Sequence, residues 1–296
     1  DARAARRGRG RASPQAGPGA AQGGTLRARF RGLSSPDAGA ALGRTTALLA
    51  EGRAGVAYPG LAPSEWAEAS AQRVFGLRET AAERSNLAMA NLDAQGDVTL
   101  MVTLYSGSRS DRRSYVLPET IQLGPLQWTQ LNSVLARAGF ANGWAVVERI
   151  AGSAPFYAYG VFNDAGTNDG SFIDPVPATA GEATRTVPVV LELGIYSTEL
   201  ILANPTETDL DVTLRYVESS LPGSLGVPRR PGVDFLRARE QKAVEAIPHL
   251  RALGVDVGPA GASYAGSLTA SFSASGQPAP GFAGARAKSP GGAGGT

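Results

Sequence analysis

A two-strand unit occurs twice in this chain and sets the strongest limit on its fold. Residues 85–105 read SNLAMANLDAQGDVTLMVTLY, and residues 198–216 read TELILANPTETDLDVTLRY. In both copies an apolar run ends in Ala-Asn, a polar turn follows, and Asp-Val-Thr-Leu begins a second apolar run. Alternating polar and apolar residues predict β-strands, and a unit repeated about 113 residues further along predicts a duplicated domain.

The composition supports an all-β chain with about two domains. A length of 296 residues is enough for two domains of ordinary size. The 38 glycines and 20 prolines favour short strands and turns over long helices. The absence of cysteine excludes disulfides and thiolate metal sites.

Residues 72–178 are expected to form one complete antiparallel β-sandwich, because strand-like runs recur at the spacing typical of that fold. The predicted strands are Arg73–Leu77, Asn86–Asn91, Val98–Tyr105, Arg113–Leu117, Glu119–Leu123, Trp144–Ile150 and Phe156–Phe162. Leu131 to Ala138 has helical spacing, and Gly139 is expected to end that short helix.

Residues 179–275 are expected to form a second β-sandwich of the same type. Its predicted strands are Thr186–Leu191, Glu199–Ala203, Asp211–Val217, Val233–Arg237 and Leu268–Phe272. A short helix is predicted at Val244 to Leu253, in the same place as the helix of the first copy. We expect this sandwich to be incomplete, with an unpaired sheet edge, and residues 276–296 to be a disordered Gly/Pro-rich tail.

The N-terminal part of the chain is expected to hold the closing strands of a preceding repeat, at residues 25–60, followed by a linker at 61–71. This prediction rests on seven residues that match the C-terminal part at constant spacing: Leu26, Ala28, Phe30, Pro36, Gly39, Ala41 and Arg44 match Leu268, Ala270, Phe272, Pro278, Gly281, Ala283 and Arg286. The chain also lacks an initiating Met, so we expect a fragment or a processed piece of a longer protein.

Residues 1–24 are expected to be a disordered Arg/Gly-rich tail, since their largest aliphatic residue is alanine. They carry five arginines and one aspartate, a charge of +4, so the rest of the chain has a charge of −2 and the net charge is +2. No aromatic residue interleaves these arginines, so nucleic-acid binding is not expected. No apolar run approaches the length of a membrane span.

The candidate catalytic residues are few. His249 is the single histidine and lies in the predicted helix of the second copy, where the first copy has none. The nearest carboxylate pairs are Glu192 with Glu199 and Asp209 with Asp211, at strand ends where solvated carboxylates are expected. An enzyme would need a cleft with convergent carboxylates, and the sequence gives no reason to expect one.

Two clusters are candidate binding sites. Asn163, Asp164, Asn168 and Asp169 lie around glycines, and their oxygens suit Ca²⁺; the same residue types also make ordinary hairpin turns. Tyr157 and Tyr159 lie on one face of a strand, with Phe156 on the other, so one set is expected in the core. If the two tyrosines face solvent, they would make a ligand-binding surface.

The repeated unit also resembles a known type of repeat. The residues that carry the resemblance are Asn86, Leu87, Asn91, Val98, Thr99, Leu100, Gln127, Trp128, Gln130, Leu131, Asn132 and Ala158-Tyr159-Gly160. Their pattern is similar to the tandem, immunoglobulin-like β-sandwich repeats of large bacterial secreted or cell-surface proteins. The second copy departs from it by lacking the aromatic residue of Trp128.

The resemblance implies a non-enzymatic spacer or adhesion repeat of a larger extracellular bacterial protein, with no cofactor other than the candidate calcium. Its expected partners are other domains of the same chain, a polysaccharide or a surface protein. The alternative is an accessory carbohydrate-binding module of a secreted hydrolase. A row of solvent-exposed aromatic residues would favour this alternative.

Overall fold

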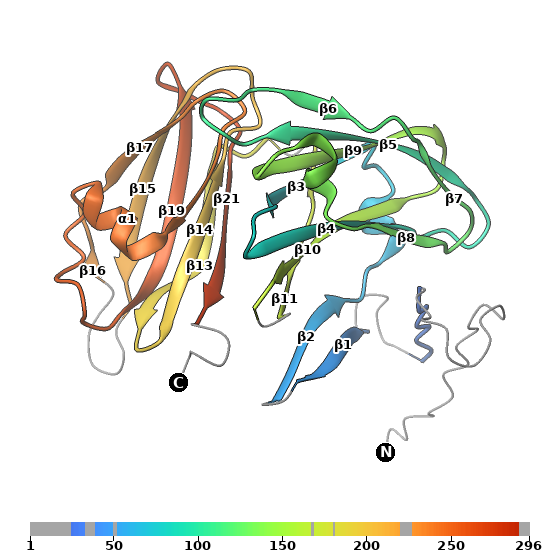
Figure 1. Cartoon of the computed structure of the whole chain (residues 1–296), viewed down its shortest axis with the longest axis horizontal. Coiled ribbons are helices and arrows are strands. Elements are labelled where there is room, and N and C mark those ends of the chain that lie inside the picture. The colour runs from blue at the N-terminus through green and yellow to red at the C-terminus, as the bar shows by residue number, and fades with distance from the viewer. Residues whose placement is uncertain are drawn as a thin grey trace.

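The computed structural model describes residues 25–32, 39–49, 52–166, 169–179, 181–219 and 227–289 (Figure 1). The described chain is mostly β-strand in antiparallel sheets, with one short α-helix and two 3₁₀ turns. This confirms the all-β prediction. The predicted disordered tail at 1–24 lies outside the described residues.

We call residues 71–177 the first unit. Its elements are β3 (Ala71–Arg78), β4 (Glu83–Asn91), β5 (Val98–Ser106), β6 (Ser114–Val116), β7 (Ile121–Leu123), β8 (Trp128–Leu131), η3 (Val134–Ala138), β9 (Asn142–Gly152), β10 (Phe156–Asp164), β11 (Gly170–Ile173) and β12 (Val176–Pro177). One sheet has the order β12-β3-β9-β5-β6, with β7 also on β5, and the other has the order β11-β10-β4-β8. Side chains from both sheets, such as Leu104 and Met89, share one buried core.

We call residues 184–288 the second unit. Its elements are β13 (Thr184–Leu193), β14 (Tyr196–Ala203), β15 (Leu210–Glu218), β16 (Val227–Pro228), β17 (Gly232–Leu236), β18 (Gln241–Glu245), α1 (Ala246–Ala252), β19 (Tyr264–Ala274), β20 (Gln277–Pro278) and β21 (Phe282–Lys288). In Figure 1 its strands, yellow to red, stand beside the green strands of the first unit. β15, β19 and β13 lie on one side of the core, and β18, β14 and β21 are joined to them through the β13–β14 hairpin.

The two units repeat the same strand pairing. β3 pairs with β9 as β13 pairs with β19, and both ladders shift register at the same place, between Val74 and Leu77 and between Val187 and Val190. A side-chain hydroxyl from the next strand accepts a hydrogen bond beside each register shift. Ser85 Oγ accepts a hydrogen bond from the amide of Arg78, and Thr198 Oγ1 accepts one from the amide of Leu191.

The repeated Ala-Asn pair has one structural role in both units. Asn91 and Asn204 are fully buried where β4 and β14 end. The side-chain oxygen of each asparagine accepts a hydrogen bond from the amide two residues later. The side-chain nitrogen of Asn91 donates to the carbonyl of Leu123, at the end of β7, and that of Asn204 donates to the carbonyl of Arg237, directly after β17. Buried polar groups need such partners, so the asparagine fixes the turn in each copy.

The Asp-Val-Thr-Leu match of the two copies is out of register in space. Leu104 of β5 lies opposite Ala145 of β9, and Tyr216 of β15 lies opposite Leu268 of β19. Ala145 and Leu268 are equivalent, because Val74 of β3 and Val187 of β13 pair with them just before the register shift. Val98 is therefore equivalent to Leu210 rather than to Val212. A slip of two residues keeps every side chain on its own face of a strand, so the sequence pattern cannot reveal it.

The second unit does not end near residue 275, contrary to our prediction. β21 pairs along the length of β14, as β10 pairs with β4 in the first unit. The expected unpaired edge of β14 is therefore filled, and the expected tail is ordered through residue 289. The Gly- and Ala-rich composition of residues 281–287 suggested disorder, but these small residues fit closely against neighbouring rings, as Gly281 does against Phe272.

The helical segments are shorter than predicted. The region Leu131 to Ala138 begins as the end of strand β8 and continues as the 3₁₀ turn η3, which Gly139 ends in a left-handed conformation, with φ 67°. The helix predicted from Val244 is likewise preceded by strand β18. In both units a short strand pairs with the edge of β4 or β14 before the helical turn starts.

The N-terminal part forms a separate hairpin of β1 (Leu42–Leu49) and β2 (Gly52–Pro59), followed by the 3₁₀ turn η2 (Pro63–Trp66). Gly39 lies against the ring of Phe30, and Gly281 lies against the ring of Phe272 in the same manner. A Cβ on either glycine would overlap the ring. The correspondence between residues 25–60 and the closing strands of a repeat stays a prediction.

Candidate functional site at the junction of the two units

The outer face of the first sheet of the first unit is covered by the second unit. Phe75, Trp144 and Ala203 form a buried cluster there, and Phe282 packs against it. The rings of Phe75 and Phe282 stack with centroids 4.4 Å apart, and Trp144 stacks on Tyr105 at 4.1 Å. Buried aromatic contacts of this kind supply most of the apolar free energy of an interface.

Gln241 is the polar centre of this junction. It is the first residue of β18 and is 2 % exposed. Its Oε1 accepts a hydrogen bond from the amide of Gly76 at 2.8 Å, and its Nε2 donates to Asn142 Oδ1 at 2.7 Å and to Gly143 O at 2.9 Å. Its backbone bonds to Gly107 and to the side chain of Asn142. Every polar atom of this buried side chain is thus paired across the junction.

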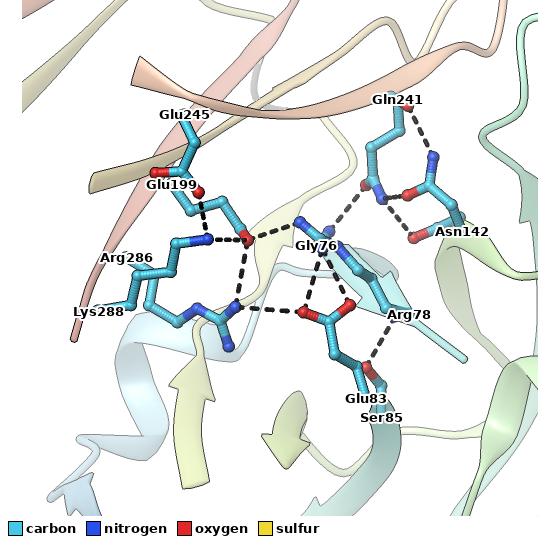
Figure 2. A network of polar contacts seen from close by, with 11 residues as sticks. Gly76, Arg78, Glu83, Ser85, Asn142, Glu199, Gln241, Glu245, Arg286 and Lys288 are labelled. Carbon is cyan, nitrogen blue, oxygen red and sulfur yellow. Dashed lines mark hydrogen bonds and ion pairs between the residues drawn. The ribbon is translucent and has the colours of Figure 1, made fainter. Parts of the chain in front are cut away.

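A cluster of charged residues lies beside Gln241 (Figure 2). Glu199, on β14, is 5 % exposed and lies between two arginines. Arg78 Nη2 of the first unit is 2.7 Å from Glu199 Oε1, and Arg286 Nη2 of the second is 3.2 Å from Glu199 Oε2. Arg78 also pairs with Glu83 of its own unit at 3.0 Å, and the guanidinium of Arg286 lies over the ring of Phe162.

The junction therefore has a bonded polar centre, an aromatic cluster and a paired charge cluster. A buried charge is costly unless it is paired, and Glu199 has cationic partners from both units. Such an interface fixes the relative orientation of the two units, because sliding either one would leave Gln241 and Glu199 without partners.

His249 is held by a contact with a buried carboxylate. Its Nε2 lies 2.8 Å from Asp234 Oδ2, and Lys242 Nζ lies 2.5 Å from Asp234 Oδ1. Burial alone would raise the pKa of Asp234, but the hydrogen bonds from His249, Lys242 and the amide of Phe235 together hold it well below its usual value. All three side chains belong to one corner of the second unit, on β17, β18 and α1.

The candidate carboxylates do not converge on a cleft. Glu199 is in the junction, and Glu192 pairs with Arg251 at 2.6 Å. Asp209 Oδ1 accepts the amide of Ala238 at 2.9 Å, and Asp211 is exposed on β15.

The candidate calcium residues lie at the turn between β10 and β11. Asn163 pairs with Gly170 in that hairpin, and the amide of Asp164 donates to Asp169 O at 3.1 Å. Asn168 lies outside the described residues. Among the residues that the structure describes, no group of three or more acidic or histidine side chains is placed to hold a metal ion.

Tyr157 and Tyr159 are both buried, at 2 % and 9 % exposed, and so is Phe156 on the other face of β10. The expectation that one face of this strand would be open is wrong, because the N-terminal segment forms a further layer. Tyr58 of β2 and Trp66 of η2 pack edge-on against these rings. Burial, and then the hydrogen bond that the hydroxyl donates to Asp174, raise the pKa of Tyr157 well above its usual value.

Sequence reasoning missed the central residues of the junction, although one signal was present. Gly76 interrupts an otherwise regular strand and has φ 82°. A glycine inside a strand pattern marks a bulge or a close approach of another group. Gln241 carries no comparable signal, since its role depends on a partner strand far away in the sequence.

Comparison with family models and with curated proteins finds no match to this chain. No helix in the described part of the chain is long and apolar enough to cross a membrane.

Proposed function

We propose that the chain is a non-enzymatic structural segment in which two tandem β-sandwich repeats stack in a fixed orientation. The repeats span about residues 72–178 and 179–288, the second extended from residue 275 because β21 pairs with β14. In the extracellular bacterial protein that the sequence resemblance implies, such a stack holds neighbouring domains at a set distance or serves adhesion to a polysaccharide or a surface protein.

The observation that carries this proposal is the bonding of Gln241 across the junction. Loosely linked domains have small, polar interfaces and move relative to one another. Here one buried side chain makes three hydrogen bonds to the neighbouring unit, next to stacked aromatic rings and a charge cluster. A spacer needs this kind of junction, whereas two independent binding modules do not.

The strand order supports β-sandwich repeats in general rather than the immunoglobulin topology. In an immunoglobulin sandwich the first, second, fourth and fifth strands share a sheet, and the third, sixth and seventh share the other. In the first unit, with β6 and β7 taken as one strand, the first strand (β3) pairs with the sixth (β9), and the seventh (β10) pairs with the second (β4).

The buried state of Tyr157 and Tyr159 favours the spacer over an accessory carbohydrate-binding module. Stacking on sugar rings needs an exposed aromatic face, and these two rings are covered by β2 and η2. His249 and Glu199 have no catalytic role in such a segment, because the contact of His249 with Asp234 and the ion pair of Glu199 with Arg78 account for their positions.

Nuclear magnetic relaxation of the full chain tests the proposal. Two units joined rigidly tumble as one body, so backbone amides of β5 and β15 should report the same rotational correlation time. Two distinct and shorter correlation times would show independent tumbling and would contradict the proposal.

A further inference from the structure

Arg78 of the first unit contacts strand β14 of the second unit at Glu199. The first unit has an equivalent position on its own strand β4, and a hollow lies there. In the second unit β14 and β18 pair Leu200 with Val244, and in the first unit β4 and β8 pair Leu87 with Leu131 at the equivalent place. One residue further along these ladders, Glu199 and Glu245 are therefore equivalent to Asn86 and Asn132.

The filled place in the second unit is rich in acceptors. Glu199 and Glu245 are paired across β14 and β18, and each carboxylate has a cationic partner. Arg78 reaches Glu199 from β3 of the first unit. The side chain that enters from the neighbouring unit is thus a cation, and Glu199 binds it in addition to Arg286.

The equivalent place in the first unit is a hollow of about 300 Å³, lined by Arg84, Asn86, Gln130, Asn132 and Ser133. Asn86 is 8 % exposed, and its Oδ1 accepts the amide of Ser133 at 3.1 Å. Its Nδ2 has no hydrogen-bond partner among the described residues, and neither has the guanidinium of Arg84. The hollow therefore offers unsatisfied donors and a positive charge, where the second unit offers carboxylates.

We propose that this hollow is a docking socket for a carboxylate side chain carried by the β3-type strand of another repeat of this kind. A guanidinium with a free amide donor binds a carboxylate through charge-assisted hydrogen bonds, and it repels the arginine that the second unit accepts. The polarity of the two sockets is reversed, so each selects a different neighbour and the repeats stack in a defined order. This inference rests on the proposed stacking of repeats.

Titration of the full chain with side-chain analogues tests the socket directly. N-acetyl-glutamate methylamide should bind in the millimolar range and shift the side-chain amide resonances of Asn86 and Asn132 saturably, whereas N-acetyl-arginine methylamide should not. Arg84→Gln should weaken binding about tenfold, and Arg44→Gln, on the exposed β1 strand, should leave it unchanged. Equal shifts with both analogues, or no saturable shift with either, would overturn the proposal.

Transfer of the socket into the second unit provides a second test that uses the existing junction. Ser197→Arg, Glu199→Asn and Glu245→Asn introduce Arg84, Asn86 and Asn132 of the first unit's lining, and Arg286→Val with Lys288→Asn replaces the two cations of β21 by their counterparts in β10. Arg78→Glu should then raise the melting temperature in this background, although it lowers it in the natural one. If Arg78→Glu lowers the melting temperature in both, the socket does not select a carboxylate. A rigid natural junction together with a failed titration would remove this inference and leave the proposed function standing.

Discussion

Gln241 reaches across the junction and accepts a hydrogen bond from the backbone of Gly76, at 2.8 Å, in the bulge of β3. The bulge turns one amide of the strand out of its own ladder, and the side chain of the second unit satisfies it. The bulge of β3 has a counterpart in β13, where Val189 occupies the position of Gly76 and is 55 % exposed.

Gln241→Ala should destabilise the chain by about 3 kcal/mol, because it leaves buried donors and acceptors of Gly76, Asn142 and Gly143 without partners. Urea unfolding followed by circular dichroism measures this change. Gln122→Ala, at an exposed position of β7, is the matched control and should change the free energy of unfolding by less than about 0.5 kcal/mol. Equal effects of the two variants would contradict the role of Gln241.

Glu199→Gln should cost about 2–4 kcal/mol of stability, because Arg78 and Arg286 then lose their buried anionic partner. The surface pair of Glu119 with Arg137 is the comparison, and Glu119→Gln should cost about 0–1 kcal/mol. Both values come from denaturant unfolding at equal ionic strength. A loss at Glu199 no larger than that at Glu119 would show that the charge cluster is not a stabilising contact.

Asn91→Ala and Asn204→Ala should have matched effects, about 2 kcal/mol each, since the two residues cap equivalent turns. The turns are on separate units and share no contacts, so the double variant should lose the sum of the two. A large loss in one unit and none in the other would show that the duplicated Ala-Asn pair does not have duplicated function.

Tyr216→Phe should be neutral or stabilising at neutral pH, because the buried hydroxyl of Tyr216 has no hydrogen-bond partner among the described residues. Burial raises the pKa of this tyrosine to about 12. In the unfolded chain this tyrosine ionises near pH 10. Its neutral phenol therefore contributes fully to the free energy of unfolding below about pH 10, and this contribution is lost as the pH rises to 12.

Free energies of unfolding measured between pH 8 and pH 12 check that stability falls as the pH rises. The natural chain should lose stability faster than Tyr216→Phe over that range, by about 1.4 kcal/mol for each pH unit at most. Parallel curves for the two proteins would mean that Tyr216 titrates in the folded state as it does in the unfolded one.

Local patterns in the sequence predicted local structure well. Alternation placed β4, β5, β14 and β15, and the repeated Ala-Asn pair marked both turns, because these signals depend on neighbouring residues in the chain. The two-residue slip between the copies went unseen for the same reason, since a strand pattern has a period of two.

Features that depend on distant segments could not be predicted. Tyr157 is buried by Trp66, about 90 residues earlier in the chain, and no pattern around either residue indicates this contact. β21 is a strand because β14 offers an edge for it, although its own composition suggests disorder. The junction is a third case, since Gln241 and Gly76 become neighbours only through the fold.

Distance measurement between the two units tests whether their junction is fixed. The chain has no cysteine, so Gln122→Cys and Arg215→Cys place one spin label on an exposed position of each unit. Double electron–electron resonance should give one narrow distance distribution, which Gln241→Ala broadens. A broad or multiple distribution in the chain with natural Gln241 would show that the two units move relative to one another.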